Sequence, residues 1–112
     1  MGDVLLGEAV LVQIVQRLVL AADPDRIILN LFGSRARGGV RSNSDYDLLV
    51  IRESEEPRYS RSAPLYAALA DIDAEVEVMV YTSQEVREWS SVPQAFVTTA
   101  IREGKLLYER KN

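Results

Sequence analysis

The pattern of apolar and polar positions along the chain predicts helices that alternate with strands. Residues 4–22 contain no Pro, and no Gly after Gly7, and their dense apolar positions predict a helix that ends at the DPD turn following it. The next run, RIILNLF at 26–32, is short, apolar and rich in residues that favour strands. We therefore expect the chain to start with a helix and then a buried strand.

The middle of the chain continues this alternation. Residues 45–52 and 74–81 predict two further strands, the second from its alternating glutamates and valines. The polar segment 53–62, which contains a proline, predicts an exposed and mobile loop, and residues 64–70 predict a helix.

The last third predicts two helices and a final strand. The sequence TSQE at 82–85 resembles a capping box, which predicts a helix through Trp89. The sequence SVP at 91–93 predicts the start of another helix with Pro in its first turn, and Gly104 predicts its end. A short strand at 105–109 follows. Strands that alternate with helices predict an α/β fold, here in a single domain spanning 1–112.

Composition limits the chemistry that this chain can perform. It has 112 residues, of which 47% are hydrophobic and 27% charged, as in one globular domain. The formal net charge of −4 argues against broad nucleic-acid binding, which requires a basic surface. The chain contains no Cys and no His, so thiolate and imidazole catalysis are excluded. Catalysis must therefore use carboxylates, hydroxyls, Arg, Lys or a bound metal.

The sequence shows no sign of membrane insertion. The start MGDVLLGEAV carries an acidic residue where a signal peptide needs basic ones. The longest apolar stretch, 9–22, is interrupted by Gln13, Gln16 and Arg17 and is too short to span a bilayer. We expect a cytoplasmic protein that does not bind membranes.

Two carboxylates open the second predicted strand. Asp45 and Asp47 are two residues apart, so their side chains project from the same face of the strand. Two such charges repel each other unless a cation joins them, and Mg²⁺ prefers carboxylate oxygens together with substrate phosphates. The alternative is that both aspartates simply cap the strand end in solvent.

A phosphate-binding pattern precedes the aspartates. Gly33 and Ser34 end the first predicted strand, where free backbone N–H groups and a small residue let a phosphate approach closely. Arg35, Arg37 and Arg41 follow, and guanidinium groups suit phosphate oxygens, although at least one of the three is expected to be only solvated. Beside the aspartates, this pattern predicts a site for a nucleoside triphosphate with Mg²⁺. The P-loop pattern GxxxxGK[ST] is absent.

A third carboxylate would complete a site for two metal ions. Glu75 and Glu77 both lie in the third predicted strand and face the same way. Spacing alone does not choose between them. The alternative is that both face solvent on a half-exposed strand.

These motifs together resemble a known family. The order of a strand, Gly33-Ser34, ten residues, and Asp45-Tyr46-Asp47 at the start of the next strand is similar to the signature of the DNA polymerase β-like nucleotidyltransferase superfamily. The form GSRARG…SDYDLLV in so short a chain resembles its minimal nucleotidyltransferase branch, and the tail FVTTAIREGKLLYER is also similar. The resemblance implies a small mixed β-sheet flanked by helices, of the α/β or α+β class.

The resemblance also implies roles for individual residues. Asp45 and Asp47 would bind metal, and the match of VEVMVYTSQE to the family's third acidic segment selects Glu77, where the family usually has Asp. The residues Gly33, Ser34, Arg35 and Arg37 would bind the triphosphate and the leaving pyrophosphate. Two Mg²⁺ ions and ATP are the implied cofactor and substrate, and nucleotidyl transfer to a hydroxyl is the implied reaction.

The resemblance further implies a partner. Minimal nucleotidyltransferases commonly pair with HEPN-domain toxins, and some act as antitoxins by transferring AMP to a tyrosine of the toxin. The many apolar residues of the first helix predict either a second chain packed on it, such as a homodimer, or a helix buried in its own core. The alternatives to this function are a binding module that neutralises its partner by contact alone and a small-molecule nucleotidyltransferase of the aminoglycoside-modifying kind.

Overall fold

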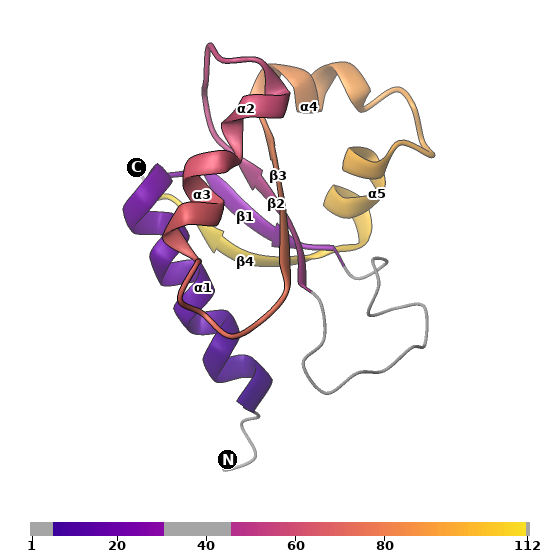
Figure 1. Cartoon of the computed structure of the whole chain (residues 1–112). Helices are drawn as coiled ribbons and strands as arrows, with labels where there is room; N and C mark the ends of the chain where they lie inside the picture. Colours follow the sequence, from indigo (N-terminus) through magenta and orange to yellow (C-terminus); the bar gives the residue numbers. More distant parts are fainter. Residues whose placement is uncertain (1–5, 31–45, 112) are drawn as a thin grey trace.

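The computed structural model describes residues 6–30 and 46–111. Helices are interspersed with strands along them, and Figure 1 shows one sheet with helices on both sides. The elements in chain order are α1 (Leu6–Ala22), β1 (Arg26–Leu29), β2 (Tyr46–Ile51), α2 (Arg58–Arg61), α3 (Ala63–Ala68), β3 (Val76–Tyr81), α4 (Ser83–Trp89), α5 (Phe96–Glu103) and β4 (Lys105–Glu109). All four predicted strands are confirmed within the described residues: β4 has the predicted ends, and β3 starts two residues later than expected. Residues 31, 32 and 45 of the first two predicted strands lie outside the described ranges.

The four strands form a single mixed sheet in the order β3-β2-β1-β4. Strand β1 pairs antiparallel with β2 and with β4, whereas β2 and β3 run parallel. Parallel neighbours need a crossover connection, and α2 and α3 lie in the segment that provides it. The expected small mixed sheet flanked by helices is therefore confirmed.

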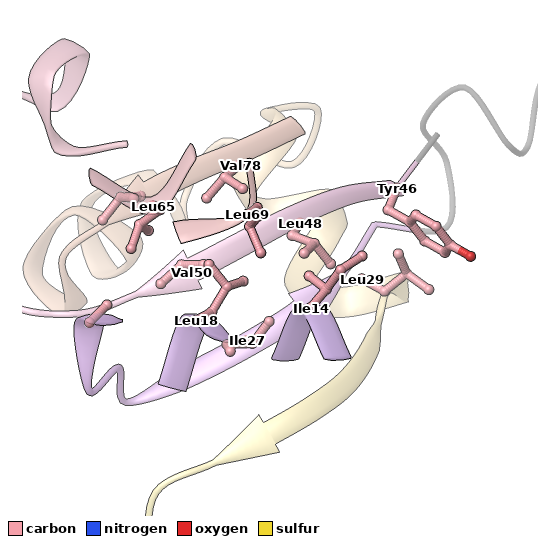
Figure 2. Close-up of a cluster of buried hydrophobic side chains, with 12 residues drawn as sticks. Ile14, Leu18, Ile27, Leu29, Tyr46, Leu48, Val50, Leu65, Leu69 and Val78 are labelled. Atoms are coloured by element: carbon pink, nitrogen blue, oxygen red, sulfur yellow. The ribbon is translucent and has the colours of Figure 1, made fainter. Parts of the chain in front are cut away.

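One face of the sheet carries the larger part of the core. Helices α1 and α3 cover this face, and Figure 2 shows their side chains meeting those of β1, β2 and β3. Tyr46 and Leu48 of β2 point to this side, away from the aspartate between them. The buried residues of this cluster are Ile14, Leu18, Ala22, Ile27, Leu29, Tyr46, Leu48, Val50, Leu65, Leu69, Val78 and Val80.

The opposite face is covered by α5, with α4 beside it (Figure 1). Its buried residues are Ile28, Leu49, Ile51, Tyr81, Val97 and Ala100. Gly104, which follows α5, lies against β1: a Cβ atom there would be 2.6 Å from the carbonyl oxygen of Leu29 and 2.7 Å from Cγ2 of Ile28. Only a residue without a side chain allows α5 to end this close to the sheet.

The outer edge of β3 is closed by side chains. The hydroxyl of Tyr66 accepts the N–H of Val78 at 2.8 Å, and Nη1 of Arg61 donates to the carbonyl oxygen of Val80 at 3.1 Å. An edge strand otherwise presents unpaired backbone groups to other chains. These two side chains take the place of a further strand.

The segment predicted to be an exposed loop, 53–62, contains α2, so that prediction is wrong in part. Arg61, at the end of α2, is only 8% exposed. Its guanidinium donates to both carboxylate oxygens of Glu85 at 2.7 and 3.1 Å, and to the carbonyl oxygen of Glu56 at 2.8 Å. The side chain of Arg61 is buried because the Glu85 carboxylate in α4 pairs with it. The local composition of residues 53–62 does not reveal this distant partner.

Helix α4 begins as the capping box predicts. The hydroxyl of Thr82 accepts the N–H of Glu85 at 3.1 Å, and the Glu85 carboxylate accepts the N–H of Thr82 at 3.0 Å. The guanidinium of Arg61 and this backbone N–H lower the pKa of Glu85 below its usual value. Glu85 thus caps its own helix and joins it to α2.

Helix α5 begins at Phe96, not at 91–93 as predicted. Between α4 and α5 the N–H of Val92 donates to the carbonyl oxygen of Trp89 at 2.9 Å, and the N–H of Ala95 donates to that of Val92 at 3.1 Å. These short-range bonds make turns in place of a first helical turn. Pro93 suits such a turn as well as it suits a helix start, because it has no N–H group to satisfy in either.

Helix α1 packs one side on the sheet and is tied to the segment after α3. Arg17 donates to both carboxylate oxygens of Asp71, at 2.5 and 2.9 Å, and to the carbonyl oxygen of Ala68 at 3.0 Å. The outer side leaves Val12 55% and Leu20 85% exposed, so the helix is not enclosed by its own domain. In the described ranges, no helix is both long enough and apolar enough to cross a bilayer.

Candidate functional site

Two of the three predicted metal-binding carboxylates lie beside each other on the sheet. Asp47 of β2 and Glu77 of β3 are register partners across the parallel pair. Along β2 the alternation that buries Leu49 under α5 also places Asp47 on that face, and along β3 Glu77 shares a face with Tyr81. Both carboxylates therefore belong to the sheet face opposite α1 and α3.

The backbone fixes this end of the sheet. The N–H of Asn30, directly after β1, donates to the carbonyl oxygen of Asp47 at 2.8 Å. On the other side of β2, the N–H of Tyr46 donates to the carbonyl oxygen of Glu75 at 2.9 Å. The start of β2 is thus held between its two neighbours, which limits how far Asp47 moves relative to Glu77.

The structure distinguishes the two glutamates that spacing left open. Glu77 lies inside β3, in register with Asp47, whereas Glu75 precedes the strand by one residue. Both are exposed. In-register neighbours on one face lie closer than residues displaced by two along the strand. Glu77 is therefore nearer to Asp47 than Glu75 is, and its role as a metal ligand stays a prediction.

The remaining predicted site residues fall outside the described ranges. They are Asp45 of the metal site, and Gly33, Ser34, Arg35 and Arg37 of the triphosphate site. Within residues 6–30 and 46–111, no group of three or more acidic side chains is placed to hold a metal ion. The assignment of all these residues stays a prediction.

The donor set that the structure does describe suits a hard cation. Asp47 and Glu77 offer carboxylate oxygens from adjacent strands on one face, and Mg²⁺ is usually held by one or two carboxylates together with substrate phosphates. Asp47 is half-buried and Glu77 is exposed, so a ligand can reach Glu77 from solvent. These residues therefore fit the metal that the sequence predicts.

Asn30 is a polar residue of this region that the sequence reading did not select. It is 7% exposed and directly follows β1. Its backbone bond to Asp47 continues the antiparallel pairing of Leu29 with Leu48 by one residue, so Asn30 lies opposite Asp47. The sequence does contain a feature that singles out Asn30, because an Asn inside the apolar run RIILNLF interrupts the pattern of a buried strand.

Comparison with known proteins identifies the class. The chain matches the family described as polymerase beta, nucleotidyltransferase, over residues 17–112. This span includes the whole sheet and both carboxylates. The chain belongs to the polymerase β nucleotidyltransferase family, which confirms the resemblance seen in its motifs.

One relative is a protein adenylyltransferase MntA from Aphanizomenon flos-aquae (strain 2012/KM1/D3). It is 32% identical over 84 residues, and the match covers 73% of this chain and 56% of that protein. The chain thus spans about half the length of this relative. No solved structure matches the chain significantly.

Proposed function

We propose that this protein transfers a nucleoside monophosphate, AMP from ATP, to an acceptor hydroxyl in a reaction that requires Mg²⁺. The observation that carries the proposal is the in-register pair Asp47 and Glu77, on one face of the sheet in a member of the polymerase β nucleotidyltransferase family. The predicted Asp45 would add the third carboxylate, and the predicted Gly33-Ser34 motif would bind the phosphates.

In the proposed reaction, the acceptor oxygen attacks the α-phosphate and pyrophosphate leaves. Asp47 and Asp45 would hold Mg²⁺ against the triphosphate, and Glu77 would help to hold a second ion or accept the proton of the hydroxyl. The metal supplies charge neutralisation and a lower pKa for the acceptor hydroxyl. Ser34, the nearby backbone N–H groups, and Arg35 or Arg37 would bind the pyrophosphate as its charge develops.

We propose a tyrosine of a HEPN-type toxin as the acceptor, with this protein as its cytoplasmic antitoxin. The description of the relative as a protein adenylyltransferase supports a protein acceptor. The exposed apolar side chains of Val12 and Leu20 on α1 support a contact with a second chain, either the toxin or another copy.

Glu77 supports a second candidate function. The family usually has Asp at this position, and the longer glutamate side chain changes where its oxygens lie. A protein with a weakened metal site would neutralise its partner by contact, without transfer. A small-molecule nucleotidyltransferase is a third candidate, in which a homodimer would complete the acceptor site.

Transfer of label from ATP tests the proposal. The chain is incubated with Mg²⁺, ATP labelled at the α-phosphate and lysate of the source organism, and Asp45→Ala and Asp47→Ala variants are compared with wild type. Label on a protein with wild type alone supports adenylyl transfer, and mass spectrometry identifies the modified tyrosine. Label on a small molecule supports the third candidate.

A second result would contradict the proposed transfer reaction. If wild type and both variants retain the same partner from the lysate and none transfers label, the protein acts by contact and the proposed reaction is wrong. The matched control is Glu75→Ala, which removes an exposed carboxylate next to the site and is expected to leave transfer unchanged.

A further inference from the structure

Three polar residues lie in one line across three adjacent strands. Asn30 follows β1, its N–H donates to the carbonyl oxygen of Asp47 in β2, and Asp47 is the register partner of Glu77 in β3. Alternation along each strand assigns all three to the face covered by α5, since Ile28, two residues before Asn30, packs there. We call Asn30, Asp47 and Glu77 the site row.

Exposure rises steadily along the site row. Asn30 is 7% exposed, Asp47 is half-buried and Glu77 is exposed. Glu77 is thus the member of the row most open to solvent, and Asn30 is the most enclosed. An enclosed residue opposite Asp47 is placed to contact the carboxylate of Asp47.

The chemistry of the two side chains matches. An ionised carboxylate only accepts hydrogen bonds, and the carboxamide of Asn offers two N–H donors. Residues directly opposite each other on antiparallel strands have Cβ atoms roughly 5 Å apart, which is within reach of these short side chains. The carboxamide of Asn30 is therefore placed to donate to the carboxylate of Asp47 across the antiparallel pair.

We infer that Asn30 is a positioning residue that orients the carboxylate of Asp47 for metal and nucleotide binding. The inference rests on the proposed function, because Asp47 needs a fixed orientation only if it binds a ligand. Partners of metal ligands act in this way in other proteins, and their loss typically weakens metal binding about 10- to 100-fold. The backbone bond between Asn30 and Asp47 does not involve the carboxamide, so substitutions isolate the side chain.

Two substitutions of Asn30 separate the possible roles. Asn30→Leu keeps a similar volume and removes every polar atom of the side chain. Asn30→Asp keeps the shape and Oδ1 but, when ionised, has no donor. If Asn30 donates to Asp47, both variants bind Mn²⁺ with a non-hydrolysable ATP analogue about 10-fold more weakly than wild type. If Asn30 were itself a metal ligand, Asn30→Asp would bind as tightly as wild type or more tightly, and the inference would be wrong.

The measurement is titration calorimetry of the full chain in mildly alkaline buffer, which keeps the carboxylates ionised. Melting of each variant without metal or nucleotide reports folding separately, and Ile28→Val, on the same face and farther from the site row, is the matched control. If Asn30→Leu does not fold, Asn30→Asp carries the test. Binding of both variants within twofold of wild type overturns the inference.

The result also separates this inference from the proposed function. A wild-type chain that binds neither Mn²⁺ nor the analogue overturns both proposals. Wild-type binding that does not change on substitution of Asn30 overturns only the role of Asn30. Weaker binding in both variants, with melting near that of the control, supports the role of Asn30 even when the acceptor is unknown.

Discussion

Asp47 and Glu77 occupy the same level of two parallel strands, with their side chains on one face of the sheet. No turn or hairpin joins them, because the chain between them, residues 48–76, crosses over through α2 and α3. The register of β2 with β3 alone brings the two carboxylates together. A slip of one residue in this pairing would move Glu77 to the other face, so the site depends on the register that Val78 and Val80 fix by burial.

Substitution of Glu77 tests its place in the site. Glu77→Gln removes the charge while keeping the shape, and we expect nucleotidyl transfer to fall at least about 100-fold, as on loss of a positioned acid–base or metal-binding group. Glu77→Asp restores the residue that the family usually has, and we expect it to retain or increase activity. Glu75→Gln is the control. Equal loss in the Glu75 and Glu77 variants would contradict the assignment.

Arg61 and Glu85 form a largely buried ion pair that joins α2 to α4. Arg61→Met removes the charge that faces Glu85, and we expect the free energy of unfolding to fall by about 3 kcal/mol, as when one partner of a buried pair is lost. Urea unfolding measures this change. Arg87→Met is the control, at an exposed position of α4. An equal loss there would show that the buried pair is not responsible.

Acid is expected to weaken the link between α1 and the segment after α3. Arg17 lowers the pKa of Asp71 from 3.8 to about 2, so the folded state favours the ionised carboxylate. The stability that this pair contributes is present above about pH 4 and is lost as the pH falls towards 2. Asp71→Asn should therefore lower the urea midpoint slightly at neutral pH and by clearly less near pH 2, where about half of the Asp71 carboxylates of the folded state are protonated. A difference of the same size at both pH values would contradict this account.

The close approach of α5 to β1 makes Gly104 sensitive to any side chain. A Cβ atom would lie 2.4 Å from the carbonyl oxygen of Ala100 and 2.6 Å from that of Leu29. We expect Gly104→Ala to lower the free energy of unfolding by about 2 kcal/mol through overpacking. Glu103→Ala, at the exposed neighbouring position, is the control. An unchanged thermal midpoint in Gly104→Ala would show that the backbone adjusts without cost.

The sequence predicts the elements of this fold better than their tertiary contacts. Apolar runs and the capping box at Thr82 locate the strands and α4, because these signals are local. The burial of Arg61 depends on Glu85, which is 24 residues away in the sequence. The polar composition of residues 53–62 therefore predicted an exposed loop. The start of α5 was also missed, because turns after α4 replace the first helical turn that Pro93 suggested.

In the candidate site too, the sequence predicts local features better than tertiary contacts. Alternation within a strand predicts that Asp47 and Tyr46 occupy opposite faces, but it does not say which strand becomes the neighbour of β2. The parallel register with Glu77 is a tertiary relationship that neither spacing nor the family resemblance predicted; the resemblance only selected Glu77 as the third acidic residue. Asn30 was overlooked because its apolar neighbours define the strand, and its position beside Asp47 emerges only from the antiparallel pairing.

The two edge strands of the sheet, β3 and β4, differ in how readily they can pair with a strand of another chain. At β3, an incoming peptide would have to displace the Tyr66 hydroxyl from Val78 and the Arg61 guanidinium from Val80. In the described part of the chain, β4 pairs with β1 alone. A fibre that grows by strand addition needs two sheet edges on every molecule that can pair with another chain. A molecule with one such edge can form only a dimer. The side chains that close β3 therefore protect the protein against open-ended polymerisation.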